Sequence, residues 1–180
     1  SSAASGDASC STCDDNMYSL PEASSCGYVC EAGSYFVSGA SCATCGAGTY
    51  SSAGNLDTAC SACDAGTYNN ASGLLACSAC DAGTYAEAPG SRSCQSCLVG
   101  TYQSATGQSK CFECEAGTFA SEAGMSQCEV CPAGYFSADG INCEPCSLGT
   151  AASSAASTSC EPCPQGTIAA QDGTSQCVPC

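Results

Sequence analysis

Eleven pairs of cysteines recur along the chain at intervals of 15 to 18 residues. The pairs begin at Cys10, Cys26, Cys42, Cys60, Cys77, Cys94, Cys111, Cys128, Cys143, Cys160 and Cys177. All are C-x-x-C except the pair that encloses three residues, Cys26 and Cys30. Because a unit of about 17 residues cannot bury a core alone, it must stack on its neighbours. The spacing therefore predicts a small disulfide-rich repeat fold, an elongated rod of tandem cystine-stapled units with short strands and turns, no helix and no large hydrophobic core.

A phrase of constant form follows the second cysteine of nearly every pair, as in Cys63-Asp-Ala-Gly66-Thr67-Tyr68. The glycine indicates a turn that needs a positive φ or a close backbone approach. The threonine and the aromatic residue favour a short extended segment. We expect the aromatic ring to pack over the disulfide of its own unit as a miniature core, and a later glycine such as Gly73 to turn the chain back. Ala151 and Ile168 stand where other units have the aromatic residue.

The cysteine content also indicates the compartment. The 180 residues include 22 Cys, with no Trp and no His. A chain this poor in large apolar side chains needs covalent cross-links, which persist in oxidising surroundings. We therefore expect an extracellular location, at the cell surface or in a secreted appendage. The sequon Asn70-Ala71-Ser72 predicts N-glycosylation of Asn70.

The charge balance excludes two classes of partner. The chain has seventeen acidic residues and only two basic ones, Arg92 and Lys110. Nucleic acid and anionic membranes are bound through Lys and Arg, so neither is expected as a partner. No apolar stretch predicts direct insertion into a membrane. The acids are interpreted as a solvated, self-repelling surface. Calcium binding is the alternative, with Asp14-Asp15-Asn16 as the nearest approach to a ligand loop.

Paired C-x-x-C motifs are also typical of zinc sites. Here the usual gap between pairs is 13 residues, and eleven successive pairs would be needed. Zinc modules usually carry Lys and Arg and often His, whereas this chain has only two basic residues and no His. Haem attachment needs C-x-x-C-H. Structural disulfides are therefore predicted, with no metal and no cofactor.

Two regular disulfide schemes fit the spacing. In the crossed scheme two pairs interlock, as in Cys77–Cys94 with Cys80–Cys97, and alternate units should differ. No such alternation is seen, so the sequential scheme is preferred, in which the second Cys of each pair joins the first Cys of the next. It gives Cys13–Cys26, Cys30–Cys42, Cys45–Cys60, Cys63–Cys77, Cys80–Cys94, Cys97–Cys111, Cys114–Cys128, Cys131–Cys143, Cys146–Cys160 and Cys163–Cys177, and leaves Cys10 and Cys180 unpaired within this stretch.

The array is expected to be continuous over residues 1–180, with about ten units. Residues 1–9 resemble the tail of a preceding unit, and residues 177–180 resemble the start of a following one. No capping features appear at the ends. We therefore expect the chain to be part of a longer array.

The repeated phrase resembles the ephrin-receptor-like cysteine-rich repeats of extracellular proteins. It is also similar to the first small module of tumour necrosis factor receptor domains. That second resemblance implies a bond from the cysteine before x-x-G-x-[YF] to a cysteine about 14 positions on, which is the spacing from Cys63 to Cys77. The chain is similar in its C-x-x-C content to variable surface proteins of parasitic protists, and a surface antigen is one functional alternative.

No catalytic role is expected, because the chain has no His and its carboxylates are scattered over turns without an apolar pocket. The leading hypothesis is a structural constituent of an extracellular filament, appendage or surface coat. It would associate with copies of itself as a homo-polymer or lateral assembly, and glycans are a further partner. The alternative is a ligand-binding or adhesion stalk of a cell-surface receptor. Leu74 and Leu75 would then be either an exposed contact site or a pair that tucks against the neighbouring unit.

Overall fold

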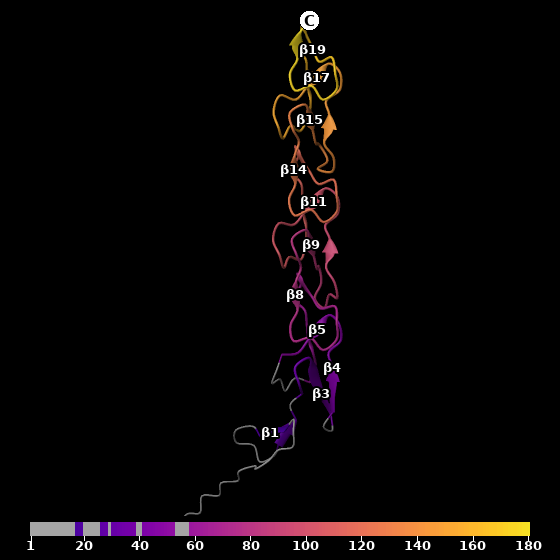
Figure 1. Cartoon of the computed structure of the whole chain (residues 1–180), viewed down its shortest axis with the longest axis vertical. Coiled ribbons are helices and arrows are strands. Elements are labelled where there is room, and N and C mark those ends of the chain that lie inside the picture. The colour runs from indigo at the N-terminus through magenta and orange to yellow at the C-terminus, as the bar shows by residue number, and fades with distance from the viewer. Residues whose placement is uncertain (1–16, 20–25, 29, 39–40, 53–57) are drawn as a thin grey trace, which may run out of the picture. The chain divides into compact units, whose positions relative to one another are not determined.

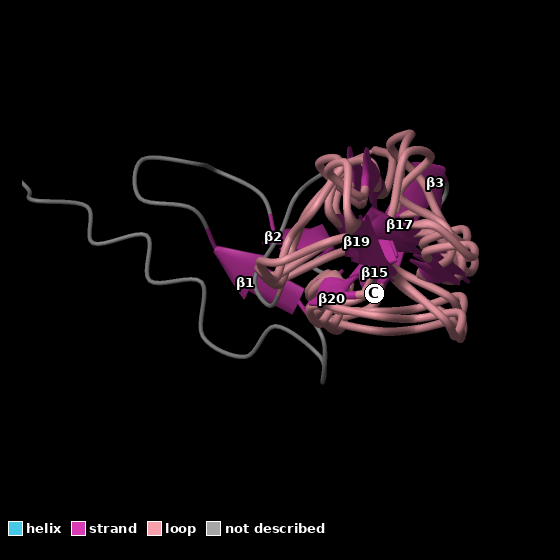
Figure 2. Cartoon of the chain, turned by 90° about the horizontal axis from the view of Figure 1, so that it is seen from above, coloured by secondary structure: helices cyan, strands magenta, loops and turns pink. Residues whose placement is uncertain are grey.

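A computed structural model describes residues 17–19, 26–28, 30–38, 41–52 and 58–180 of the chain. These residues form twenty short strands, arranged as ten two-stranded sheets that each join strands consecutive in the sequence. Figure 1 shows the strand pairs, and Figure 2 shows strands and connecting loops without a helix among the described residues. The predicted fold class of short strands and turns in a disulfide-rich tandem repeat is confirmed.

The strands are β1 (Met17–Ser19), β2 (Cys26–Tyr28), β3 (Ser34–Ser38), β4 (Ser41–Thr44), β5 (Thr49–Tyr50), β6 (Ser61–Ala62), β7 (Thr67–Tyr68), β8 (Ser78–Ala79), β9 (Thr84–Tyr85), β10 (Gln95–Ser96), β11 (Thr101–Tyr102), β12 (Phe112–Glu113), β13 (Thr118–Phe119), β14 (Glu129–Val130), β15 (Tyr135–Phe136), β16 (Glu144–Pro145), β17 (Thr150–Ala151), β18 (Glu161–Pro162), β19 (Thr167–Ile168) and β20 (Val178–Pro179).

The chain divides into two units that interleave in sequence. The first comprises the described residues up to Asp64 together with Tyr68–Ser78 and Gly90–Arg92. The second comprises Ala65–Thr67, Ala79–Pro89 and Ser93–Cys180. The same local pattern of turn, hairpin and disulfide occurs in both units.

One module runs from the second Cys of a pair to the residue before the second Cys of the next pair, and residues 97–113 are an example. Its first turn is closed by Thr101, whose backbone N and Oγ1 both donate to Leu98 O, at 3.0 and 2.8 Å. Gly100 occupies the third turn position with φ +79°, as a type II turn requires. The chain then enters β11, and Tyr102 lies opposite Phe112 of β12. The phrase G-T-Y thus encodes a turn residue, a turn cap and the first strand of a hairpin.

Backbone hydrogen bonds join each module to the next in the second unit, and residues 97–113 show the pattern. Gly100 N donates to Ala120 O at 2.8 Å, Gln103 N to Met125 O at 3.2 Å, and Gly124 N to Cys97 O at 2.8 Å. The first of these bonds has counterparts in both units, at Gly33–Ser51, Gly48–Asn69, Gly66–Ala86, Gly83–Gln103, Gly117–Ser137, Gly134–Ala152 and Gly149–Ala169. Each module is therefore held to its neighbour mainly through its backbone, as expected for a solenoid-like repeat.

The turn glycine also touches the module after next. Gly83 has φ +83°, and a β-carbon built on it would lie 2.0 Å from the carbonyl oxygen of Gly124. Real β-carbons never approach another heavy atom so closely, so this position excludes every side chain. Both reasons that the sequence predicts for the glycine, a positive φ and a close backbone approach, are confirmed here.

Gly83 and Gly107 form a matched pair for mutation. Gly107 has φ +70°, but a β-carbon on it would come no closer to a neighbouring atom than 3.7 Å, at Ala79 Cβ. Gly107→Ala should lower the free energy of unfolding only by the cost of the left-handed backbone, about 1–2 kcal/mol. Gly83→Ala should lose more, because the Gly124 backbone must also move. Hydrogen exchange of the surrounding amides, with the disulfides intact, measures both losses, and equal losses would contradict the role given to the glycine contact.

Candidate structural core and interaction surface

Nine disulfides link the described cysteines, with Cα–Cα distances of 5.6 to 5.8 Å. The structure has Cys30–Cys42, Cys45–Cys60, Cys63–Cys77, Cys80–Cys94, Cys97–Cys111, Cys114–Cys128, Cys131–Cys143, Cys146–Cys160 and Cys163–Cys177. All nine follow the sequential scheme. Cys180 is free and exposed, whereas Cys10 and the predicted bridge Cys13–Cys26 lie outside the described residues, because Cys13 does.

The second cysteine of most pairs forms the interior of its module. Cys45, Cys63, Cys80, Cys97, Cys131 and Cys146 are fully buried. Their bridge partners are all partly exposed, and Cys42, which is bonded to the buried Cys30, is exposed. Each disulfide therefore runs from the interior of a module to its edge, and it fixes the hairpin between the two cysteines.

The residue immediately after the aromatic position is also buried, which the sequence analysis did not predict. It is at most 3% exposed in eight modules, at Ser51, Asn69, Ala86, Gln103, Ala120, Ser137, Ala152 and Ala169. This position is always Ala, Ser, Asn or Gln in these modules. That restriction to small or amide side chains is the signal in the sequence from which burial could have been predicted.

The two amides at this position are satisfied by backbone groups. Asn69 Nδ2 donates to Thr49 O at 2.6 Å, and its Oδ1 accepts from Ala71 N at 3.0 Å. Gln103 Nε2 donates to Lys110 O at 2.7 Å, and its Oε1 accepts from Ala105 N at 3.0 Å. Because no described buried side-chain N or O lacks a partner, these polar groups are buried without a large penalty.

The aromatic residues are largely but not fully buried. This holds for Tyr35, Tyr50, Tyr68, Tyr85, Tyr102, Phe119 and Phe136. Partial burial is compatible with a ring that covers the edge of its module, and the packing of each ring over the disulfide of its own unit stays a prediction.

The acidic side chains of the described residues all lie at the surface. The pKa of Asp139 is lowered, first by the hydrogen bond from Ile141 N to Oδ1 at 2.9 Å and then by that from Asn142 N. The bonds stabilise the charged form and fix a turn. The solvated acidic surface predicted from the sequence is confirmed for the described residues, and the Asp14-Asp15-Asn16 segment of the calcium alternative lies outside them.

Three other sequence features lie on the described surface. Asn70 of the sequon is exposed. Leu74 and Leu75 are 37% and 55% exposed, so they do not tuck under the neighbouring module.

Within the described part of the chain, no three His, Cys, Asp or Glu side chains gather into a metal-binding group. The same residues include no helix with the length and apolarity needed to cross a membrane.

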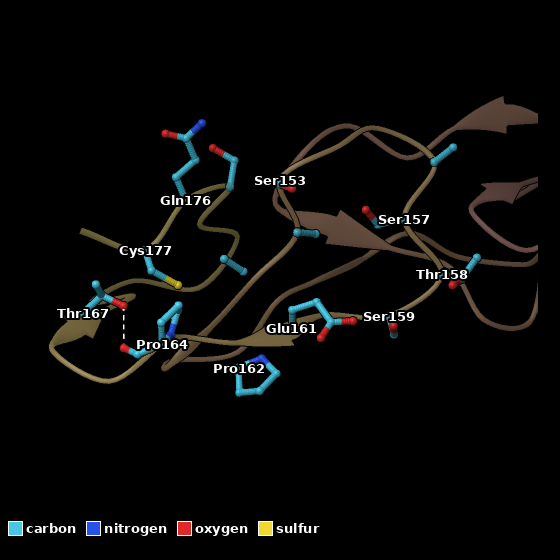
Figure 3. A pocket seen from close by; sticks show the side chains of 14 residues that line it. Ser153, Ser157, Thr158, Ser159, Glu161, Pro162, Pro164, Thr167, Gln176 and Cys177 are labelled. Atoms are coloured by element: carbon cyan, nitrogen blue, oxygen red, sulfur yellow. Dashed lines mark hydrogen bonds between the residues drawn. The ribbon is translucent and has the colours of Figure 1, made fainter. Parts of the chain in front are cut away.

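Two surface hollows occupy equivalent places in the second unit. The first, of about 550 Å³, is lined by residues that include Tyr102, Phe112 and Gln127. The second, of about 710 Å³, is lined by residues that include Ala151 and Glu161. Figure 3 shows the second hollow, with Gln176, Glu161, Pro162 and Pro164 among its labelled side chains and a hydrogen bond from Thr167 Oγ1 to Pro164 O.

The equivalence follows residue by residue from the repeat. Tyr102, Phe112, Glu113, Glu115, Thr118, Gln127 and Cys128 of the first hollow correspond to Ala151, Glu161, Pro162, Pro164, Thr167, Gln176 and Cys177 of the second. The two hollows are thus the same groove between adjacent modules, repeated three modules apart. They differ in that Ala151 and Glu161 of the second stand where the first has Tyr102 and Phe112.

The sequential bridges, glycine turns and paired short strands define a disulfide-rich tandem repeat of the extracellular type. A family model described as "Tyrosine-protein kinase ephrin type A/B receptor-like" matches residues 48–97, 83–117 and 100–139. These matches overlap and together span just over half of the chain, so the chain belongs to the ephrin-receptor-like repeat family. A search of curated proteins gave no match to the chain. The family and the many disulfides point to an extracellular or cell-surface location.

Proposed function

We propose that the chain is a structural constituent of an extracellular filament, appendage or surface coat, in which disulfide-stiffened copies associate with one another. The observation that supports the proposal most directly is the way the modules are joined. Backbone hydrogen bonds and one disulfide per module fix the fold. The side chains that face outward are therefore free to serve contacts between molecules rather than folding.

The composition of the surface supports the same proposal. Exposed positions are rich in Ser, Ala and carboxylates, with scattered apolar side chains such as Leu98, Val130 and Leu148 at 55% to 70% exposure. Small side chains permit close lateral packing. Exposed Asn70 would carry a glycan in a secreted protein. The proposal assigns no catalytic step, metal or cofactor to the chain.

Electron microscopy of the native, unreduced protein tests this proposal. We expect ordered assemblies at high concentration that disappear when the disulfides are reduced, because each module depends on its bridge. An alkylated, reduced sample serves as the control. Protein that stays monomeric at every concentration, while its disulfides are intact, would contradict a self-associating structural role.

A second candidate function is a ligand-binding or adhesion stalk, and the exposed pair Leu74 and Leu75 favours it. These two adjacent leucines are 37% and 55% exposed and form a small apolar patch on the surface. The pair lies in the first unit, in the loop between β7 and β8. Such a loop can differ between modules without altering the backbone bonds that hold them together.

The double variant Leu74→Ser with Leu75→Ser tests the second candidate. Binding to cells or matrix should fall at least tenfold if the pair is a contact site, whereas folding should be unaffected because neither side chain is buried. Val130→Ser, which changes a 55%-exposed side chain elsewhere, is the matched control. Unchanged binding by the double variant would remove the leucine pair as a candidate.

A further inference from the structure

An aromatic pair lines the first hollow, and the chain's single lysine lies beside it. Tyr102 and Phe112 lie opposite each other on β11 and β12, with ring centroids 6.2 Å apart. Phe112 is 47% exposed. Lys110 Nζ lies 5.4 Å from the centre of the Phe112 ring, within the range of a cation–π interaction. We call these three residues the aromatic patch.

The second hollow has small and acidic residues at the positions of the patch. Ala151 stands where the first hollow has Tyr102, Glu161 where it has Phe112, and Ser159 where it has Lys110. Ala151 and Glu161 lie opposite each other on β17 and β18. We call this site, centred on Ala151, Ser159 and Glu161, the small-residue hollow.

We propose that the aromatic patch of one copy docks into the small-residue hollow of a second copy of this chain. The Phe112 and Tyr102 rings would enter the space that Ala151 leaves open. Lys110 would come close to Glu161, which is exposed at the rim. The inference rests on the proposed self-association and names the surfaces that perform it.

Charge supports a second copy as the occupant. The chain carries a net charge of −15 at pH 7, so two copies repel unless opposite charges meet at their contact. Lys110 is one of only two basic residues, and it lies on the aromatic patch. The small-residue hollow has Glu161 as the ionisable side chain among its lining residues. Ring burial and this ion pair would then offset the repulsion between the remaining acids.

The contact is heterologous, because patch and hollow are different surfaces three modules apart on the same chain. Each copy can give its patch to one neighbour and its hollow to another. Contacts of this kind build open assemblies when the rotation that relates one copy to the next does not close into a ring. The proposed pair of surfaces would therefore build a filament rather than a single dimer.

The test uses the full chain with its disulfides intact and measures assembly by sedimentation velocity. Ala151→Tyr restores the ring found at this position in other modules and should fill the small-residue hollow. Phe112→Ser removes the exposed ring of the aromatic patch. Each should weaken self-association at least tenfold, whereas the control Val130→Ser, outside both surfaces, should assemble as the unchanged chain does. A 1:1 mixture of Ala151→Tyr and Phe112→Ser should give heterodimers but no longer assemblies, because one variant keeps the patch and the other keeps the hollow.

Charge reversal gives an independent readout. Lys110→Glu and Glu161→Lys should each weaken assembly, and the double variant should recover most of it. Assembly of all these variants at the strength of the unchanged chain would overturn the proposed contact while leaving the structural function standing. Failure of the unchanged chain to assemble at any concentration would overturn both. Unaltered disulfide connectivity in each variant verifies that folding is intact.

Discussion

The disulfide inside each module is the interaction on which the rest of the structure depends. The chain has too few large apolar side chains to offset the entropy of ordering a backbone of this length. Closing a loop of about 15 residues contributes about 3 kcal/mol in the chain-entropy model. One bridge per module therefore replaces the hydrophobic core that a globular domain of the same length would have. The fully buried sulfurs of Cys80, Cys97 and Cys131 occupy the centre that leucines would occupy elsewhere.

Contacts between modules depend on the backbone, and this explains the glycine pattern. Gly83 is held by a bond to Gln103 O in the next module and lies against Gly124 in the module after that. No side chain takes part in either contact. The outer residues can therefore change from Tyr102 to Ala151, or from Phe112 to Glu161, without altering the hairpin. The backbone contacts recur from module to module, whereas the outer side chains vary. A molecule with specific lateral contacts needs such differences between the surfaces of its modules.

The cysteine spacing and the phrase G-T-Y were enough to predict the paired short strands, the glycine turn and the absence of a large core. The disulfide connectivity could not be decided from the sequence, because the spacing of Cys77, Cys80, Cys94 and Cys97 fits both the sequential and the crossed scheme. The full burial of Ala86 and Gln103 could not be derived from periodicity, because strands of two residues are too short to show an alternation. The equivalence of the two hollows likewise required the stacking, although the replacement of the aromatic residue at Ala151 was visible in the sequence.

The central claim is that sequential bridges fix each hairpin and thereby the stack. Its most direct test is disulfide mapping of the unreduced protein, digested with pepsin at acidic pH so that thiolates do not exchange the bridges. The account predicts peptides that join Cys80 to Cys94 and Cys97 to Cys111. Peptides that join Cys77 to Cys94 and Cys80 to Cys97 would instead establish the crossed scheme, and they would contradict the fold and the surfaces derived from it.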